Sequence, residues 1–272
     1  MTIEAPDSER ILLFIPAYNC ANQIPRVLAQ LESLSFSFVD EVLVVNNRSS
    51  DDTVAAACRA AESLKVPVSV VTNVENYGLG GSHKVAFAYA SSKRFDYCIV
   101  LHGDDQGDLR DLEPLVVNGE HRKVDCLLGA RFMPGSRTPG YSAFRTFGNR
   151  VFNALYSLAA GKRLFDLGSG LNLYKVRTIA SRDVSGFANN LTFNYFLILA
   201  SVHWRWKIAF FPITWREDDQ ISNVRLFRQS TQVLKILVEF FLRRGKFLAE
   251  DHTGRGIGAK YESVLTCANR TP

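Results

Sequence analysis

Short apolar runs alternate with helix-like segments through the first half of this 272-residue chain. Buried strands are predicted where the apolar runs are compact: residues 11–15, 41–46, 66–72, 97–101 and 125–130. Helices are predicted between them at 24–34, from a cap at 49–51 to about residue 64, and at 80–91. This alternation predicts an α/β fold with a mostly parallel open sheet and helices on both faces.

The second half of the chain is less regular. Helices are predicted at 144–158 and 230–244 and strands at 171–176 and 206–213, whereas the Pro- and Gly-rich residues 133–140 predict a mobile loop. The polar tail after Gly245 predicts a loose end. We therefore expect one domain over residues 1–228, followed by a C-terminal amphipathic helix and tail, residues 229–272, packed on or beside it.

Composition changes this picture little. The chain is 47% hydrophobic with a net charge of +5, which suits a protein that handles phosphates or anionic lipid and equally suits an ordinary soluble enzyme. Its five cysteines form no CxxC pair, and Cys58, Cys98 and Cys126 lie in apolar segments, so we expect reduced core cysteines in a cytosolic protein. The polar first ten residues and the absence of an apolar run near eighteen residues predict a cytoplasmic chain that is soluble or peripheral on a membrane.

Polar clusters follow four of the predicted strands, at residues 17–22, 46–52, 73–81 and 102–108. Ligands of parallel open sheets bind at the carboxyl ends of the strands. The sequence therefore predicts that these four loops meet at one sheet edge and form the active site.

The segment His102–Gly103–Asp104–Asp105–Gln106 follows the fourth strand. Adjacent carboxylates beside an imidazole and an amide are typical of a Mg²⁺ or Mn²⁺ site that bridges to a diphosphate, with Asp104 as the preferred ligand. The alternative is a solvated turn before the next helix. Asp108 is expected to cap the following segment, residues 111–117.

A glycine-rich turn, Asn76–Tyr77–Gly78–Leu79–Gly80–Gly81, precedes the third predicted helix. Such a turn can bring the backbone close to a phosphate or ribose, although a plain tight turn is the alternative. It has neither the GxGxxG order nor the spacing of a Walker lysine, which disfavours a dehydrogenase or a P-loop NTPase. Lys84, in the first helical turn, either reaches a phosphate or is a solvated surface residue.

Taken together, four segments resemble the signature motifs of family 2 glycosyltransferases. They are Phe14–Ile15–Pro16–Ala17–Tyr18–Asn19, Val44–Val45–Asn46–Asn47–Arg48–Ser49–Ser50–Asp51–Asp52–Thr53, the Asn76–Gly81 turn, and His102–Gln106, a variant of the metal-binding Asp-x-Asp motif. Gly129–Ala130–Arg131 is similar to the family's Gly-Ser-Arg segment. Phe144–Arg150 and then residues 166–171 resemble the acceptor-side stretch of dolichyl- and polyprenyl-phosphate sugar synthases, and Phe211–Pro212–Ile213 with Arg216 and Ser222 resembles their closing segment. The resemblance implies a GT-A fold, a UDP- or GDP-sugar donor, a divalent metal and inversion at the anomeric carbon.

The resemblance also implies roles for individual residues. Donor contacts are expected after the first four strands, from Pro16, Ala17, Tyr18, Asn19, Asn47, Asn76, Gly78, Gly81, Lys84, His102, Gly103 and Asp104. Asp104 would hold the metal, helped by Gln106. Arg131 and Arg216 would neutralise the diphosphate or an acceptor phosphate, and Asp166 is the candidate for acceptor activation. Asn46–Asn47 and His102 depart from the family's Asp residues at these positions.

The acceptor is left open by the sequence. A polyprenyl-phosphate-type lipid is favoured, and the predicted helix with Phe240, Phe241 and Leu242 beside Arg243 and Arg244 would suit a membrane surface or a membrane-anchored partner. The same helix would equally suit core packing. Two rival functions are transfer to a saccharide or metabolite hydroxyl in glycan assembly, and a degenerate nucleotide-binding module that has lost turnover. No nucleic-acid partner is expected.

Overall fold

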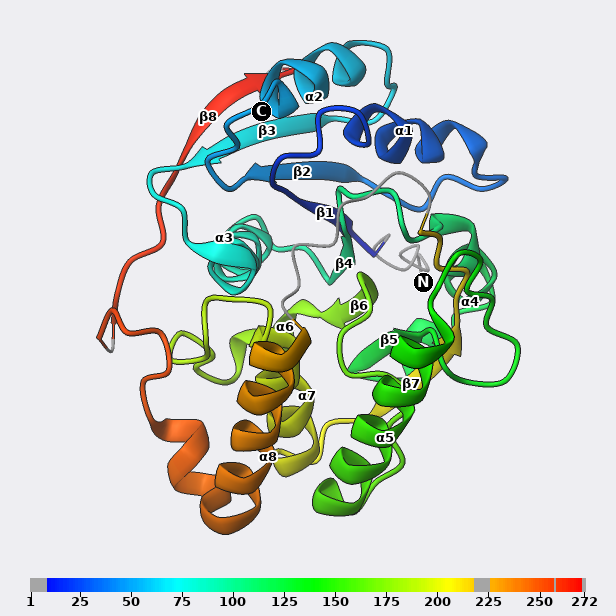
Figure 1. The fold of residues 1–272 in the computed structure, drawn as a ribbon. Coiled ribbons are helices and arrows are strands. Elements are labelled where there is room, and N and C mark those ends of the chain that lie inside the picture. The colour runs from blue at the N-terminus through cyan, green and yellow to red at the C-terminus, as the bar shows by residue number, and fades with distance from the viewer. Residues whose placement is uncertain (1–8, 218–225, 257, 271–272) are drawn as a thin grey trace, which may run out of the picture.

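The fold is built on one eight-stranded sheet, in the order β7–β5–β6–β4–β1–β2–β3–β8 (Figure 1). The computed structural model describes residues 9–217, 226–256 and 258–270. The strands are β1 (Ile11–Ala17), β2 (Glu41–Asn46), β3 (Val68–Asn73), β4 (Tyr97–Leu101), β5 (Cys126–Ala130), β6 (Leu171–Lys175), β7 (Ile208–Pro212) and β8 (Ser263–Ala268). β1 to β4 pair in parallel with one another, and β6 and β8 run antiparallel to their neighbours. The predicted α/β class is confirmed.

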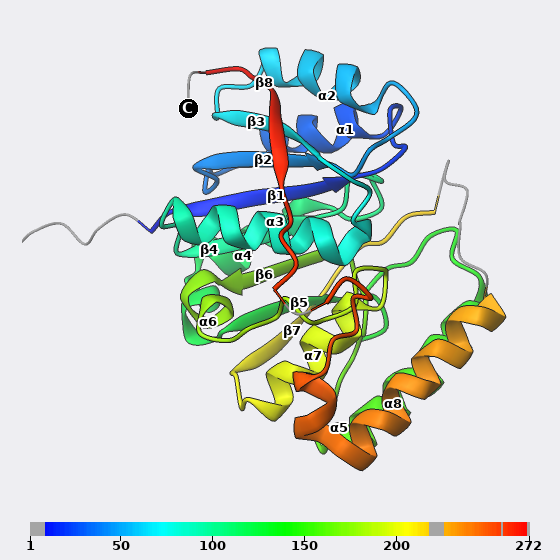
Figure 2. The ribbon, with the colours of Figure 1, turned by 90° about the vertical axis from the view of Figure 1, so that its left-hand side faces the viewer.

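Helices cover both faces of the sheet (Figures 1 and 2). They are α1 (Ile24–Ala29), α2 (Thr53–Glu62), α3 (Gly78–Ser92), α4 (Glu113–Val117), α5 (Ala143–Ala160), α6 (Val176–Ala180), α7 (Phe193–His203) and α8 (Leu226–Ala249), with the 3₁₀ turns η1 (Gln30–Ser33), η2 (Leu109–Asp111) and η3 (Glu120–Lys123). Side chains alternate along β1: Leu12 and Phe14 enter the core shared with α3, α5, α7 and α8, whereas Leu13 and Ile15 enter the core shared with α1 and α2.

The predicted elements are present with shifted ends. The strand at 97–101 has the predicted bounds, and the helix predicted at 24–34 is α-helical to Ala29 and then 3₁₀ to Ser33. Helix α7 was not predicted, because it is apolar on nearly every side and lacks a helical stripe.

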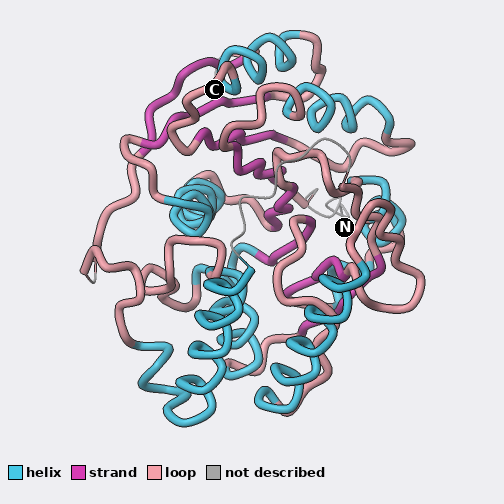
Figure 3. Tube along the Cα trace, viewed as in Figure 1, coloured by secondary structure: helices cyan, strands magenta, loops and turns pink. Residues whose placement is uncertain are grey.

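The predicted loose tail is wrong. After α8 the chain returns to the sheet, where β8 pairs antiparallel with β3. The two strands lie side by side near the C-terminus (Figure 3). This return brings Cys267 beside Cys58 of α2 in a disulfide with a Cα–Cα distance of 6.1 Å. The prediction of a reduced Cys58 is therefore also wrong, and the cysteines no longer argue for a cytosolic protein. Cys98 and Cys126 are free and buried, as expected.

Among the described helices, none combines the length and apolarity that crossing a bilayer requires.

Candidate functional site

The carboxyl ends of β1, β2, β3 and β4 lie at one edge of the sheet, which confirms that the four polar loops meet there. Two backbone hydrogen bonds join the loops. Asn47 N donates to Ala17 O at 2.9 Å, and Gly103 N donates to Pro16 O at 3.1 Å. A Cβ on Gly103 would lie 3.0 Å from the same Pro16 oxygen, so glycine permits this close approach.

The donor-side loop after β1 is held by its neighbour after β2. Asn19 adopts a positive φ of 50°, and its Oδ1 accepts from Ser50 N at 2.8 Å while its own N–H donates to Ser49 Oγ at 3.0 Å. Asn tolerates this backbone conformation better than most residues. Tyr18 is the aromatic residue of this segment and is 50% exposed, so a base could stack on its ring.

Asp104 and Asp105 have different hydrogen-bond partners. Asp105 has a positive φ of 58°, and its carboxylate accepts from Arg26 Nε at 2.7 Å and from Gln30 Nε2 at 3.3 Å on the α1 side. Arg216 NH2 also lies 3.4 Å from it. Asp105 is therefore part of the frame of the site and is not turned toward a ligand.

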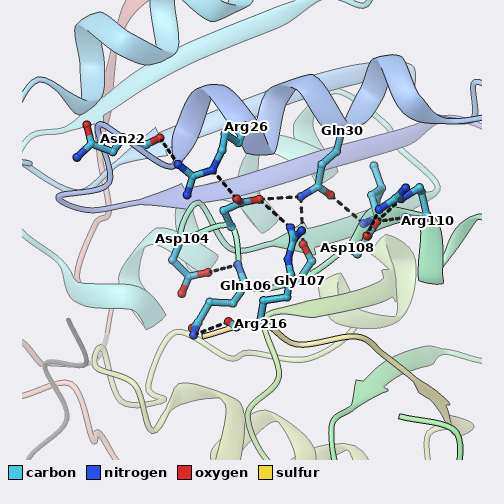
Figure 4. Close-up of polar contacts among 11 residues, drawn as sticks. Asn22, Arg26, Gln30, Asp104, Gln106, Gly107, Asp108, Arg110 and Arg216 are labelled. Atoms are coloured by element: carbon cyan, nitrogen blue, oxygen red, sulfur yellow. Dashed lines mark hydrogen bonds and ion pairs between the residues drawn. The ribbon is translucent and has the colours of Figure 1, made fainter. Parts of the chain in front are cut away.

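Asp104 is half-buried and turned away from α1 (Figure 4). Its Oδ1 accepts from Gln106 N at 3.3 Å, and within the described residues it forms no ion pair. Burial raises the pKa of the Asp104 carboxyl to about 6. A bound cation would reverse that shift, so this carboxylate fits a divalent metal.

Two neighbours extend this fit. Gln106 Nε2 donates to Arg216 O at 3.1 Å, which leaves the Gln106 carbonyl oxygen as a second oxygen donor. His102 has a buried Nε2 with no hydrogen-bond partner. No group of three or more His, Cys, Asp or Glu suited to a metal occurs in the described part of the chain. A cation here would therefore need oxygens from water or a diphosphate, as Mg²⁺ sites commonly do.

Arg131 and Asp166 form a closed ion pair beside this turn. Arg131 Nε and NH2 each lie 2.8 Å from the Asp166 carboxylate, which also accepts from Arg131 N at 2.9 Å and Gly168 N at 3.1 Å. The side chains are 12% and 2% exposed. Burial lowers the pKa of Arg131, but the Asp166 carboxylate more than offsets this and the net shift is upward. Arg131 also lies over the Trp215 ring, 5.2 Å from its centroid.

Acceptor activation by Asp166 stays a prediction, and this pairing disfavours it. A general base needs a free lone pair within reach of the acceptor proton, and the four hydrogen bonds of Asp166 all come from Arg131 and Gly168. Asp166 therefore orients Arg131.

Arg216 is tied to the Asp104 turn by its backbone, because its N–H donates to Gln106 O at 2.9 Å. Its guanidinium is 36% exposed, and among the described residues its ion-pair partner is Asp105, at the long distance of 3.4 Å. It can therefore turn to a phosphate at little cost. Ser222, which the resemblance placed with it, lies outside the described residues.

Asn47 is buried and largely committed to its neighbours. Its Oδ1 accepts from Tyr77 N at 2.8 Å and Asn73 Nδ2 at 3.1 Å, and its Nδ2 donates to Asn76 Oδ1 at 2.8 Å. One amide hydrogen remains for a base or ribose contact. The amides of Asn47 and Asn76 thus fix the loop after β3.

The glycine turn packs closely against other parts of the protein. The contact of Gly78 and Gly81 with a phosphate or ribose stays a prediction. Gly80 N donates to Asn189 O at 2.7 Å, and a Cβ on Gly78 would lie 2.4 Å from that same oxygen. A Cβ on Gly81 would lie 2.3 Å from the Tyr77 Cβ. These glycines allow α3 to pack closely against its surroundings.

Lys84 is not a solvated surface residue, whereas its predicted contact with a phosphate stays a prediction. Its ammonium is buried and donates to Phe187 O at 2.6 Å, Asn189 Oδ1 at 2.8 Å and Tyr261 OH at 3.1 Å. Burial lowers the pKa of Lys84 to about 7. Lys84 thus joins α3 to the loop before α7 and to the C-terminal segment.

Sequence reasoning missed Arg26 and Gln30. They lie one helical turn apart and reach the Asp104–Asp108 turn, where Gln30 Nε2 also donates to Gly107 O at 3.1 Å (Figure 4). Polar residues at positions i and i+4 on a helix that begins at the site edge were the available signal.

The sequence model of Glycosyl transferase family 2 matches residues 13–181, more than half of the chain. The chain belongs to family 2 of the glycosyltransferases. This glycosyltransferase is 27% identical over 192 residues to the undecaprenyl-phosphate mannosyltransferase of Micrococcus luteus, which covers 68% of this chain and 76% of the relative. It is 21% identical to the polyprenol monophosphomannose synthase of Mycolicibacterium smegmatis, over 78% of this chain and 79% of the relative.

Solved structures agree on the fold. Glucosyl-3-phosphoglycerate synthase from Mycobacterium tuberculosis, solved with Mn²⁺, UDP-glucose and glycerol 3-phosphate, superposes with a TM-score of 0.59 at 16% identity, over 92% of this chain and 83% of that one. The GT-A fold that the sequence implied is therefore confirmed for this glycosyltransferase.

Proposed function

We propose that this glycosyltransferase transfers a hexose, with inversion at the anomeric carbon, from a UDP- or GDP-sugar to a polyprenyl-phosphate-type lipid. The observation that supports this choice of acceptor is that the Asp166 carboxylate already accepts hydrogen bonds from Arg131 and Gly168. An acceptor hydroxyl needs a base to remove its proton, whereas a phosphate is already anionic. The names of the two sequence relatives point to the same class of acceptor.

Other carboxylates near the site are also engaged. Asp105 is paired with Arg26, and Glu217 is paired with Arg145 at 2.6 Å. Asp104 is the carboxylate assigned to the metal. The described residues thus supply positive charge on the acceptor side and no spare base at the positions that the resemblance assigns to acceptor activation.

On the donor side, Tyr18 and the remaining amide hydrogen of Asn47 would contact the base and ribose. Asp104 and Gln106 would hold Mn²⁺ or Mg²⁺, which when bound stabilises negative charge on the departing diphosphate. Arg216 would add a guanidinium to the same diphosphate or to the acceptor phosphate. Asp166 would keep Arg131 fixed, so that no reorganisation is needed as charge develops.

The test is a comparison of two acceptors that differ only in the phosphate. The full chain is incubated with UDP- or GDP-sugars, Mn²⁺, and either a short-chain polyprenyl phosphate or the matching polyprenol. We expect product with the phosphate alone. Transfer to the alcohol or to a saccharide would favour the hydroxyl-acceptor reading, and nucleotide binding without any transfer would favour a degenerate module.

The peripheral placement on the cytoplasmic face of a membrane, expected from the sequence, belongs to this proposal.

A further inference from the structure

Helix α5 carries an apolar stripe on its outward side. Phe144, Phe147 and Leu158 are 77%, 68% and 81% exposed, and Val151 and Leu155 continue the stripe between them. The spacing of three and four residues keeps all five side chains on one face over the length of the helix. A surface helix normally turns polar residues outward, so this face is the reverse of the usual pattern.

Helix α8 repeats the feature. Leu234, Val238, Phe241 and Leu242 are exposed, while Val233, Ile236, Leu237 and Phe240 pack inward. Both helices are therefore apolar on two sides. Their buried sides pack into the core, and their outward sides have no partner within the described residues.

The two helices lie side by side and form one layer of the molecule (Figures 1 and 2). Tyr156 OH donates to Val233 O at 2.7 Å, and Arg244 NH2 donates to Ala159 O at 2.9 Å. We call the nine exposed apolar residues of these helices the α5–α8 face: Phe144, Phe147, Val151, Leu155, Leu158, Leu234, Val238, Phe241 and Leu242.

Basic residues outnumber acidic ones around this face. Helix α5 contains Arg145 and Arg150 and no acidic residue. In helix α8, Lys235 pairs with Glu239 at 3.8 Å, and Arg243 pairs at 3.4 Å with Glu250, which follows the helix. Exposed Arg150 and Lys246 have no acidic partner within the described residues.

We infer that the α5–α8 face docks on an anionic lipid bilayer. Apolar side chains would enter the interface while the bordering arginines and lysines contact acidic headgroups. A second copy of the chain is a poorer occupant, because a twofold contact would set one basic border against another.

The face also adjoins the proposed acceptor side. Glu217, next to Arg216, accepts from Arg145 in the first turn of α5 at 2.6 and 2.7 Å. Docking through this face would therefore bring Arg216 close to the headgroup layer, where the phosphate of a polyprenyl phosphate lies. This consequence rests on the proposed function, whereas the docking itself needs neither donor nor acceptor.

The test is flotation of the full chain with phosphatidylcholine vesicles that contain or lack phosphatidylglycerol. We expect binding to the anionic vesicles, and a loss of about tenfold or more in partitioning for Phe147→Ser combined with Leu158→Ser. Because both side chains are exposed, the melting temperature should stay unchanged. Phe36→Ser is the matched control, since Phe36 is 58% exposed but lies in the loop before β2, where its backbone N–H donates to Glu113 of α4.

Three results would overturn the inference. The first is that the unsubstituted chain does not bind the vesicles, and the second is that the double variant binds them as well as the unsubstituted chain does. The third is a dimer that does not bind vesicles and that the Leu158→Ser substitution dissociates. The outcome is separable from that of the proposed function, because transfer to short-chain polyprenyl phosphate is measured without vesicles. Vesicle binding without transfer would sustain the docking and reject the function, and the reverse result would do the opposite.

Discussion

Replacement of Asp166 by Asn separates a positioning role from a role as a base. The substitution keeps the shape of the side chain and removes its charge. Arg131, whose side chain is 12% exposed, then lacks its counter-ion. Loss of one partner of a buried ion pair costs about 3–5 kcal/mol. For a chain of this size, that corresponds to a fall in melting temperature of roughly 6–15 °C.

The assay pairs urea unfolding with transfer kinetics. We expect Asp166→Asn to lower the free energy of unfolding by about 3–5 kcal/mol and to weaken acceptor use at least tenfold, because Arg131 loses its orientation. The double variant Arg131→Met with Asp166→Leu should be more stable than the single variant, since no charge is then left unpaired.

A different result would refute the reasoning. If the free energies of unfolding of Asp166→Asn and of the unsubstituted chain differ by less than about 0.5 kcal/mol, and the variant still loses turnover, then Asp166 acts on the substrate and not on Arg131.

Three further predictions concern other parts of the structure. Asp104→Asn should abolish the stabilisation by nucleotide plus Mn²⁺ in a thermal-shift assay while the apo melting temperature stays the same or rises; an unchanged nucleotide response removes Asp104 from the metal site. The pKa of Lys84 is lowered to about 7, so between about pH 7 and the ordinary pKa of a lysine the unfolded chain binds more protons than the native one. The free energy of unfolding of the parent chain should therefore rise with pH across that window. In Lys84→Met this rise should be absent. Cys267→Ser should lower the free energy of unfolding by about 2–5 kcal/mol, because the disulfide closes a loop spanning 209 positions; equal denaturation midpoints would show that the bond contributes nothing.

The fold could be predicted from the sequence where the signal is local. Apolar runs such as Tyr97–Leu101 are bounded by polar turns and give β1 to β4 in their parallel order. Strand β8 could not be predicted, because its sequence becomes a strand only by pairing with β3, far away along the chain. The disulfide between Cys58 and Cys267 follows from that same long-range pairing.

The site was predictable as a location and less so as a set of roles. Residues after strand ends gather at one edge whatever their side chains do, so the positions of Asp104, Arg131 and Arg216 could be anticipated. Their partners could not. Asp166 faces Arg131, and Lys84 faces Asn189, through tertiary contacts that one sequence does not encode by spacing.

The outward apolar stripe of α5 illustrates the same limit. From sequence alone, a helix with apolar residues on two sides is predicted to be buried. The structure is needed to show that Phe144, Phe147 and Leu158 are exposed.

The central claim is that the acceptor is a phosphate, received by Arg131 and Arg216 without a base. The most direct measurement is ³¹P and ¹H NMR of the product formed from a nucleotide sugar and a short-chain polyprenyl phosphate. The account predicts a phosphodiester between the sugar and the lipid, with the anomeric configuration opposite to that of the donor. A product joined through a hydroxyl, or one that retains the donor's configuration, would contradict it.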